Sequence, residues 1–278
     1  MSNTTDDLKK SPLGKKQTYI STYASELLFP IPRVAKRDEI GIAEPLPFKG
    51  MDIWTAFELS WLNPKGKPCV AIAEFHIPCE SPNIIESKSF KLYLNSFNQT
   101  AFESLNDFRE TLTKDLTDKT GANVNVFIRT LDTFQSTTIE TFKGECLDHL
   151  DITCDTYITQ PDFLLCDEKN IVSEALYSDL LKSNCLVTGQ PDWGSVQIRY
   201  TGPKINREGL LKYIVSFRNH NEFHEQCVER MFADIRSRCC CKNLTVYARY
   251  TRRGGLDINP IRSTEAMRSV RNIRLARQ

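Results

Sequence analysis

The order of predicted elements in residues 53–131 recurs in residues 195–250, and this repetition limits the folds open to the chain. In each part a strand and a turn are followed by a second apolar run, an amphipathic helix and a closing strand. The two copies lie on the order of 140 residues apart and share a pattern rather than residue identity. The duplication predicts an α+β protein with two similar units, each an antiparallel sheet with helices on one face.

The first copy begins with a hairpin. Residues 53–62 and 69–77 are strand-like, and the sequence NPKGKP between them is typical of a turn. Residues 84–97 fit a strand or a helix equally well. Residues 102–116 place apolar side chains at helical spacing, and residues 124–131 predict the closing strand.

The second copy is predicted in the same order. Residues 195–201 alternate between apolar and polar side chains and predict a strand. Residues 202–209 predict a turn, and the apolar run 210–217 predicts a second strand. An amphipathic helix over 221–238 and a strand over 244–250 complete the copy.

These patterns divide the chain into three parts. Residues 1–50 form an arm in which the sequence ELLFPIPR is the one apolar segment, and Pro30 and Pro32 forbid a helix there. We expect this segment to pack against the rest of the chain as an extended strap. Residues 51–150 form the first unit and residues 151–278 the second.

Composition excludes several classes of function. The formal net charge is +1, so the chain as a whole has no electrostatic attraction to nucleic acid or to an anionic membrane. It contains no apolar run long enough to predict a transmembrane helix. Ten cysteines without a secretory leader predict a reducing, cytoplasmic location rather than a disulfide framework.

Arginine is concentrated near the end of the sequence. Seven arginines follow Thr251 and are opposed by only two acidic residues, Asp257 and Glu265; the arginines are Arg252, Arg253, Arg262, Arg268, Arg271, Arg274 and Arg277. Such a segment suits local contact with phosphate, although a solvated basic tail is the commoner meaning.

Cys185 is the first candidate for chemistry. It lies seven residues before Asp192, with Gly189 and Pro191 between them. Spacing alone favours a buried core thiol and a turn aspartate. The alternative is a nucleophilic cysteine beside a protonated acid, because an aspartate that kept its proton could deliver it to the group that sulfur attacks.

Carboxylates supply the next candidates. Glu225 follows His224 at the start of the predicted helix, where an acid stabilises the helix dipole or accepts N–H bonds from a guanine-like edge. The sequence ESKS, Glu86 to Ser89, is interpreted as occupying the analogous place in the first copy.

Two further patterns remain open. The sequence RRGGLDINP (252–260) suits a phosphate contact or a plain hairpin turn. His224 and Cys227, with Cys239–Cys241 nearby in sequence, have spacing that zinc accepts, but a structural role is favoured. No Rossmann or P-loop motif is present, so any nucleotide is held in another way.

Taken together, these stretches carry a family resemblance. It rests on LLFPIPR, DIWTAFELSWLNPKGKP, IIESKSFKLYLNSFNQT, CLVTGQPDWGSVQIRYTGP, FHEQCVERMF and RRGGLDINP. The chain closely resembles the bimodular NADPH-dependent 7-cyano-7-deazaguanine reductases, the nitrile reductases of queuosine biosynthesis. The resemblance implies tandem tunnelling-fold units, assembly as a homodimer, and reduction of a nitrile to a primary amine with NADPH.

The resemblance also implies roles for single residues. Cys185 attacks the nitrile carbon to form a thioimide, and Asp192 protonates the nitrile nitrogen. The residues implied in substrate binding are Ile85, Glu86, Ser87, His224 and Glu225; those implied in NADPH binding are Ser87, Lys88, Arg253 and Gly254. No metal, and no direct contact with nucleic acid or membrane, is implied.

Two other functions would use the same residues. A cysteine-nucleophile hydrolase of nitriles or amides would share Cys185 and a thioimide but would use water in place of hydride. A purine- or pterin-binding module on the same fold would bind without catalysis. NADPH oxidation and a covalent adduct on the protein distinguish the reductase from both.

Overall fold

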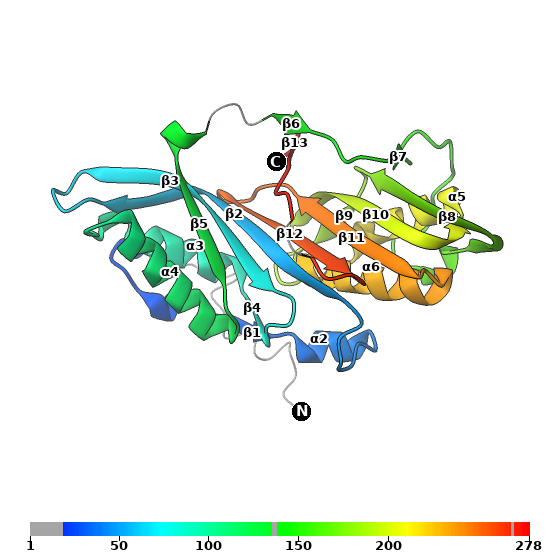
Figure 1. Cartoon of the computed structure of the whole chain (residues 1–278), viewed down its shortest axis with the longest axis horizontal. Helices are drawn as coiled ribbons and strands as arrows, with labels where there is room; N and C mark the ends of the chain where they lie inside the picture. Colours follow the sequence, from blue (N-terminus) through cyan, green and yellow to red (C-terminus); the bar gives the residue numbers. More distant parts are fainter. Residues whose placement is uncertain (1–18, 135–137, 268–269) are drawn as a thin grey trace. The chain divides into compact units, whose positions relative to one another are not determined.

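The computed structural model describes residues 19–134, 138–267 and 270–278 and divides into two compact units (Figure 1). The first unit takes in the described residues of Met1–Lys36, Asp52–Thr137 and Arg252–Asp257; the second takes in those of Arg37–Met51, Thr138–Thr251 and Ile258–Gln278. Neither unit is continuous in sequence, so the linear division predicted above does not coincide with them. Residues 1–18 of the predicted arm and Arg268 lie outside the described residues.

Helices and strands follow one another along the whole described chain. Up to residue 133 they are η1 (Ser25–Leu27), β1 (Pro30–Pro32), α2 (Val34–Glu39), β2 (Lys49–Leu62), β3 (Pro68–Pro78), β4 (Asn83–Ile85), α3 (Ser87–Ser96), η2 (Phe97–Gln99), α4 (Leu105–Thr120), β5 (Asn125–Thr130) and η3 (Leu131–Thr133). From residue 139 they are β6 (Ile139–Glu140), β7 (Glu145–Cys146), η4 (Pro161–Phe163), β8 (Cys166–Ser178), β9 (Lys182–Asn184), β10 (Pro191–Ile205), α5 (Arg207–Ser216), η5 (Phe217–Asn219), α6 (His224–Cys239), β11 (Asn243–Tyr250), β12 (Leu256–Ser263) and β13 (Arg274–Leu275).

In the first unit the strand order is β5-β3-β2, and β3 pairs with β5 in antiparallel register. Helices α3 and α4 pack against this sheet through aromatic contacts. Phe90 of α3 lies 5.2 Å from Trp54 and 5.0 Å from Phe75, measured between ring centroids. Phe108 of α4 lies 4.6 Å from Trp61 in the same way. Aromatic side chains therefore form much of the core between sheet and helices.

In the second unit the strand order is β12-β11-β10-β8-β7, and β9 pairs with the first residues of β10 (Figure 1). Its long neighbours β8 and β10 are antiparallel, as are β10 and β11, whereas β7 joins β8 in parallel. Helix α6 buries an apolar stripe against this sheet; its fully buried apolar residues are Cys227, Val228, Met231, Phe232, Ile235 and Cys239. The predicted α+β class, with antiparallel sheets, is confirmed.

Most of the predicted elements are present. The hairpin of β2 and β3, helix α4, and strands β5, β10 and β11 all occur where the sequence predicts them, as does helix α6. The Pro30–Pro32 segment is extended and pairs with β4, as expected of a strap. The ambiguous segment 84–97 is mostly the helix α3, which begins at Ser87.

One part of the second copy was predicted wrongly. Residues 202–209 are not a turn and 210–217 are not a strand, because β10 continues to Ile205 and α5 occupies Arg207–Ser216. The Asn206 side chain accepts a hydrogen bond from the Gly209 N–H at 2.8 Å and so caps the helix. A short, nearly continuous apolar run does not by itself distinguish a buried strand from a buried helix.

The duplication extends to single hydrogen bonds. In the first unit the Tyr93 hydroxyl donates to Asp115 Oδ2 at 2.7 Å, and in the second the Tyr213 hydroxyl donates to Asp234 Oδ2 at 2.6 Å. The tyrosines belong to α3 and α5, and the aspartates to α4 and α6, the second helix of each of these two pairs. A serine one turn later, Ser96 or Ser216, repeats as well: its Oγ donates to the tyrosine carbonyl.

This correspondence corrects the alignment of the carboxylates. Tyr93 and Tyr213 align α3 with α5, so the counterpart of Glu86 is Asn206, which likewise caps its helix. Glu225 instead lies in the second helix of its unit. The prediction that one duplicated position supplies a carboxylate in both units is therefore wrong.

Across the described residues, no helix combines the length and the apolar character needed to span a membrane.

Candidate functional site

Cys185 lies at the start of the loop that connects β9 to β10 in the second unit. Its N–H donates to the Gln190 carbonyl at 2.8 Å, and the Gly189 N–H donates back to the Cys185 carbonyl at 3.0 Å. Gly189 has φ of +64°, a left-handed conformation that glycine adopts without strain. These bonds fix the backbone of Cys185, and its side chain is buried although most of the loop around it is exposed.

Asp192 is brought beside this cysteine by strand register. In the β9–β10 pair, Asp192 lies directly opposite Ser183, so the two side chains share one face. Cys185 is two residues beyond Ser183 and returns to that face. The register thus makes Cys185 and Asp192 diagonal neighbours, and both side chains are buried.

His224 completes this group, which sequence reasoning had treated as a cysteine and an acid with no histidine. Its Nε2 lies 3.4 Å from Asp192 Oδ2. Its ring stacks on Tyr250 with centroids 3.7 Å apart and an interplanar angle of 5°. His224 Nδ1 is buried without a hydrogen-bond partner among the described residues. The imidazole is thus fixed by stacking and by one contact with the acid.

Tyr250 and Gly194 lie beside this group, and sequence reasoning did not single them out. They face each other in the β10–β11 register, and a Cβ on Gly194 would stand 3.1 Å from the Tyr250 ring. Gly194 therefore leaves the space in which the ring lies under His224. A glycine inside a strand, two residues after the candidate acid, was the signal that pointed to such a close approach.

Glu225 lies in the first turn of α6, where its negative charge is favourable to the helix dipole. The side chain of the preceding N-cap residue, Phe223, makes no capping hydrogen bond. Glu225 is nonetheless almost completely buried, at 2% exposure. A buried carboxylate beside His224 is unusual for a surface helix end and suits recognition of a hydrogen-bond donor.

Glu86 in the first unit has a structural role that its sequence position did not reveal. Its carboxylate caps α3 by accepting the Lys88 and Ser89 N–H groups, each at 2.7 Å. Burial raises its pKa above the ordinary value even though these two bonds lower it. Of its neighbours in the predicted site, Ile85 is buried and pairs with Pro30, whereas Ser87 is partly exposed.

The sequence RRGG forms a tight turn, which was the structural alternative noted for it. Arg253 N–H donates to the Leu256 carbonyl at 3.0 Å, and Gly254 and Gly255 both have positive φ. A Cβ on Gly254 would stand 3.2 Å from the Lys91 side chain, so the turn packs against α3. Lys88 lies one helical turn before Lys91 on the same face. Basic side chains therefore gather here within the first unit.

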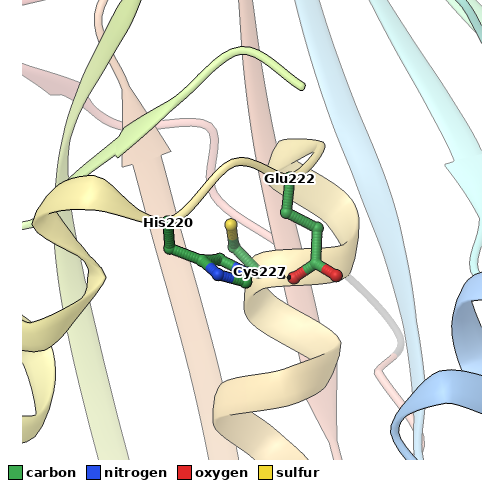
Figure 2. Close-up of side chains that lie close together, drawn as sticks. All are labelled: His220, Glu222 and Cys227. Atoms are coloured by element: carbon green, nitrogen blue, oxygen red, sulfur yellow. Dashed lines mark hydrogen bonds and ion pairs between the residues drawn. The ribbon is translucent and has the colours of Figure 1, made fainter. Parts of the chain in front are cut away.

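His220, Glu222 and Cys227 also lie close together, with ligand atoms within 4.8 Å of one another (Figure 2). Arg230 holds the Glu222 carboxylate through two hydrogen bonds of 3.0 and 3.1 Å, and His220 donates a third contact at 2.8 Å. Burial raises the pKa of the Cys227 thiol well above its ordinary value. A guanidinium on the carboxylate and a protonated thiol make this a hydrogen-bonded network rather than a cation site.

The three consecutive cysteines at the end of α6 are likewise structural. Burial raises the pKa of Cys239 and of Cys241 to about 12, so both remain thiols at neutral pH. Cys240 adopts a left-handed conformation, with φ of +49°, and ends the helix. The side chains grouped with Cys227 are His220 and Glu222, and His224 is not among them.

Comparison with known proteins adds the family. A family model described as "Nitrile reductase, 7-cyano-7-deazaguanine-reductase N-term" matches residues 19–128, and a second, "QueF-like protein", matches residues 191–269. Two curated proteins named "NADPH-dependent 7-cyano-7-deazaguanine reductase" are similar over nearly the whole chain. The protein of Chromobacterium violaceum is 59% identical over 269 residues, covering 96% of each chain. That of Dechloromonas aromatica is 57% identical over 274 residues, covering 98% of this chain and 97% of its own.

The matched segments contain most of the stretches on which the sequence resemblance rests, although Cys185 lies between the two segments. The first includes Glu86 and the residues around it, and the second includes Asp192, His224 and the Arg-Gly turn. With identity near 60% over almost its full length, the chain belongs to the family of NADPH-dependent 7-cyano-7-deazaguanine reductases.

Proposed function

We propose that this chain reduces the nitrile of 7-cyano-7-deazaguanine to the 7-aminomethyl amine with NADPH, a step of queuosine biosynthesis. Family membership supports the reaction and its cofactor. The observation that carries the proposal is the group formed by Cys185, Asp192 and His224, in which a buried thiol, a buried acid and a partly buried imidazole share one corner of the second unit.

The first chemical step is addition of the Cys185 thiol across the carbon–nitrogen triple bond. Sulfur forms a bond to the nitrile carbon, one π bond breaks, and the nitrogen takes a proton from Asp192. The thiol proton restores the acid, with His224 beside Asp192 at 3.4 Å as the group that stabilises either charge state. The product is a neutral thioimide, and atoms and charge balance without an oxidant or a reductant.

Reduction of that thioimide to the amine requires two hydrides, which NADPH supplies when bound. This chain contributes the residues that would hold its phosphates and orient it: Ser87, Lys88, Arg253 and Gly254. The fit rests on the turn at Gly254 and on the basic side chains packed against it, because guanidinium, ammonium and backbone N–H groups all bind phosphate oxygens.

Recognition of the deazaguanine requires acceptors for its N–H groups. We assign this to Glu225, with His224 beside it, and to Glu86 with the main chain of Ile85 and Ser87. Each Glu86 oxygen accepts one backbone N–H and retains a second lone pair. A carboxylate already bound at a helix N-terminus is also fixed in orientation, which reduces the entropy lost on binding.

We further propose that the protein acts as a homodimer in the cytoplasm, and that its ligands are the nitrile and NADPH, without direct contact with nucleic acid. All ten cysteines are free thiols, which agrees with a reducing compartment.

The test is an assay of purified protein with 7-cyano-7-deazaguanine and NADPH. We expect NADPH to be oxidised at two equivalents per amine formed, and the protein mass to increase by one nitrile when NADPH is omitted. Carboxylate product without NADPH oxidation would identify a hydrolase instead. Binding without adduct or turnover would leave a purine-binding module.

A further inference from the structure

The segment 270–278, named here the anchoring segment, belongs to the arginine-rich end that follows Thr251, for which a solvated tail was the commoner expectation, and it packs against the second unit instead. Its strand β13 pairs with β6 in parallel, and Leu275 is buried in a cluster with Phe142, Tyr247 and Ile261. All of these residues belong to the second unit. The segment is therefore held in place by apolar contacts as well as by backbone hydrogen bonds.

Gln278 makes the most unusual contacts of the segment. Its side chain is buried and uses both ends of its amide. Its Oε1 accepts from Arg249 Nε at 2.6 Å and from the Leu275 N–H at 3.2 Å. Its Nε2 donates to the Tyr250 carbonyl at 3.0 Å and to Asn259 Oδ1 at 2.8 Å. A buried amide that is satisfied on both sides fixes its neighbours in one arrangement.

The group fixed most firmly is Tyr250. Its carbonyl accepts from Gln278, and its N–H donates to Asn259 Oδ1 at 3.2 Å, the same oxygen that Gln278 holds. Both polar groups of the Tyr250 backbone therefore depend on one glutamine. The Tyr250 ring is the surface on which His224 stacks, and His224 is the residue that touches Asp192.

Arg277 holds the facing strand in the same way. Its Nη2 donates to the Gly194 carbonyl at 2.9 Å and to the Asp179 carbonyl at 2.5 Å. Gly194 lies two residues after Asp192 and directly opposite Tyr250. Two adjacent residues thus fix the strand that carries the acid and the strand that supports the imidazole.

We propose that Arg277 and Gln278 are positioning residues for the addition step: they set the position of His224 against Asp192 through Gly194 and Tyr250 without touching substrate. The inference rests on the proposed function for its kinetic consequence, although the geometry that it describes does not. Displacement of a reacting group by about 1 Å is enough to cost on the order of a hundredfold in rate.

The test compares Gln278→Ala and Gln278→Glu in the full chain. The glutamate variant keeps an acceptor for Arg249 and loses the donor to Tyr250, so it separates anchoring from positioning. Arg271→Ala is the matched control, since Arg271 belongs to the same segment, is largely exposed and pairs with Glu140. The rate of thioimide formation is measured by protein mass without NADPH, across a range of pH.

We expect both Gln278 variants to slow adduct formation by on the order of tenfold to a hundredfold and to shift the pH dependence of that rate, while Arg271→Ala does neither. The shifted profile is the decisive readout, because loss of folded protein lowers the rate equally at every pH. A wild-type rate and profile in both variants would overturn the proposal. So would a lowered rate with an unchanged profile, which would mark the segment as structural only.

A second measurement does not depend on the nitrile. The chain has four histidines, so the His224 ring protons can be assigned by substitution and followed by NMR. Stacking on Tyr250 places these protons in the ring current of the phenol, which shifts their resonances. We expect Gln278→Ala to reduce that ring-current shift. If wild-type protein forms no adduct, the proposed function is wrong. The chemical shifts of the His224 ring protons still test whether Gln278 positions His224. An unchanged His224 spectrum would contradict the positioning role.

Discussion

The two units share a scaffold and differ in what stands at the helix and strand ends. Each contains a pair of helices, α3 with α4 or α5 with α6, in which a tyrosine of the first binds an aspartate of the second and a serine lies one turn beyond the tyrosine. In the first unit the second helix begins with Ser104, an ordinary cap. In the second unit the same helix begins with the partly buried His224 and the buried Glu225, two residues of the candidate site.

The connections between strands differ in the same way: the one in the first unit is a plain turn, and the one in the second unit contains candidate site residues. The β2–β3 turn contains Asn63, whose side chain accepts the Lys65 and Lys67 N–H groups, and it requires no other explanation. The connection before β10 contains Cys185 and leads to Asp192. Duplication therefore preserved the polar contacts that hold the helices together, whereas the chemical groups occupy ends that can change without loss of the fold.

The largest difference between the units should appear when one cysteine from each unit is replaced by alanine. We expect Cys185→Ala to abolish both the nitrile adduct and NADPH oxidation, because no other group supplies the bond to carbon. Cys69→Ala, in the first unit, should keep wild-type rates. Mass spectrometry and NADPH absorbance measure both. Turnover retained by Cys185→Ala would end the covalent mechanism.

The acid provides the next largest effect. Asp192→Asn keeps the side-chain shape but removes the proton donor, so adduct formation should slow by about a hundredfold to ten-thousandfold. Single-turnover mass measurements without NADPH report this step alone. An unchanged rate would assign the proton to another group.

Buried ion pairs let the stability of the units be compared. In the second unit Glu229 binds Arg37 at 2.7 Å and Arg262 at 2.8 Å, and all three side chains are buried. Glu229→Gln leaves two buried cations and should lower the free energy of unfolding by about 3–5 kcal/mol.

The counterpart in the first unit is the pair between Arg33 and Asp52 at 2.6 Å. Asp52→Asn should cost less, because only one cation loses its partner and Arg33 keeps two bonds to Ser81. Urea denaturation midpoints rank the two variants, and the reverse order would refute this account.

The repeated tyrosines predict a smaller difference. Tyr213→Phe removes a donor to the partly buried carboxylate of Asp234 and should cost about 1–3 kcal/mol. Tyr93→Phe should cost less, because Asp115 also accepts from the Tyr23 hydroxyl at 2.7 Å. Denaturation of both variants measures this, and adding Tyr23→Phe to Tyr93→Phe should remove the difference.

Acid pH should act on the two units in opposite directions, by about 1 kcal/mol or less. Burial raises the pKa of Glu86, so its contribution to stability is present below the unfolded pKa and is lost as pH rises through the folded value. Burial also favours the neutral form of Glu222, but its bonds to His220 and Arg230 lower its pKa overall. Its contribution is present above the unfolded pKa and is lost as pH falls through the folded value.

Hydrogen exchange can separate these effects, as protection factors at several pH values. Amides in the body of α3, beyond the two that bond to Glu86, should gain protection on acidification, and the Glu222 amide should lose it. Glu86→Gln and Glu222→Gln should each remove the trend of its own segment only. Trends of the same sign in both segments would disprove the assignment.

Much of the fold could be predicted from the spacing of apolar side chains. The amphipathic helix α6 and the alternating strand β10 each show a clear apolar repeat in the sequence. The prediction of a strand over 210–217 was wrong because α5 is apolar on most of its surface. A short apolar run shows no periodicity that would distinguish a helix from a strand. Asn206 was the missed signal: a capping residue followed three positions later by glycine, whose N–H it binds.

For the candidate site, the sequence predicted single residues but not most of the contacts between them. Cys185 and Asp192 are close in sequence, so a hairpin was enough to place them together. The contact of His224 with Asp192, and the dependence of Tyr250 on Gln278, arise from packing between segments that are distant in sequence. No local pattern carries that information, and the role of Glu86 as a helix cap was hidden by its likeness to a binding motif.

The discontinuity of the units has a consequence for synthesis on the ribosome. The first unit includes Arg252–Asp257, and the Phe57 N–H of β2 donates to the Gly255 carbonyl at 2.8 Å. These partners are almost two hundred residues apart in the chain. A nascent chain that has just emerged through β5 still lacks that strand neighbour, so the first unit waits for nearly the whole polypeptide before its last hydrogen bonds form.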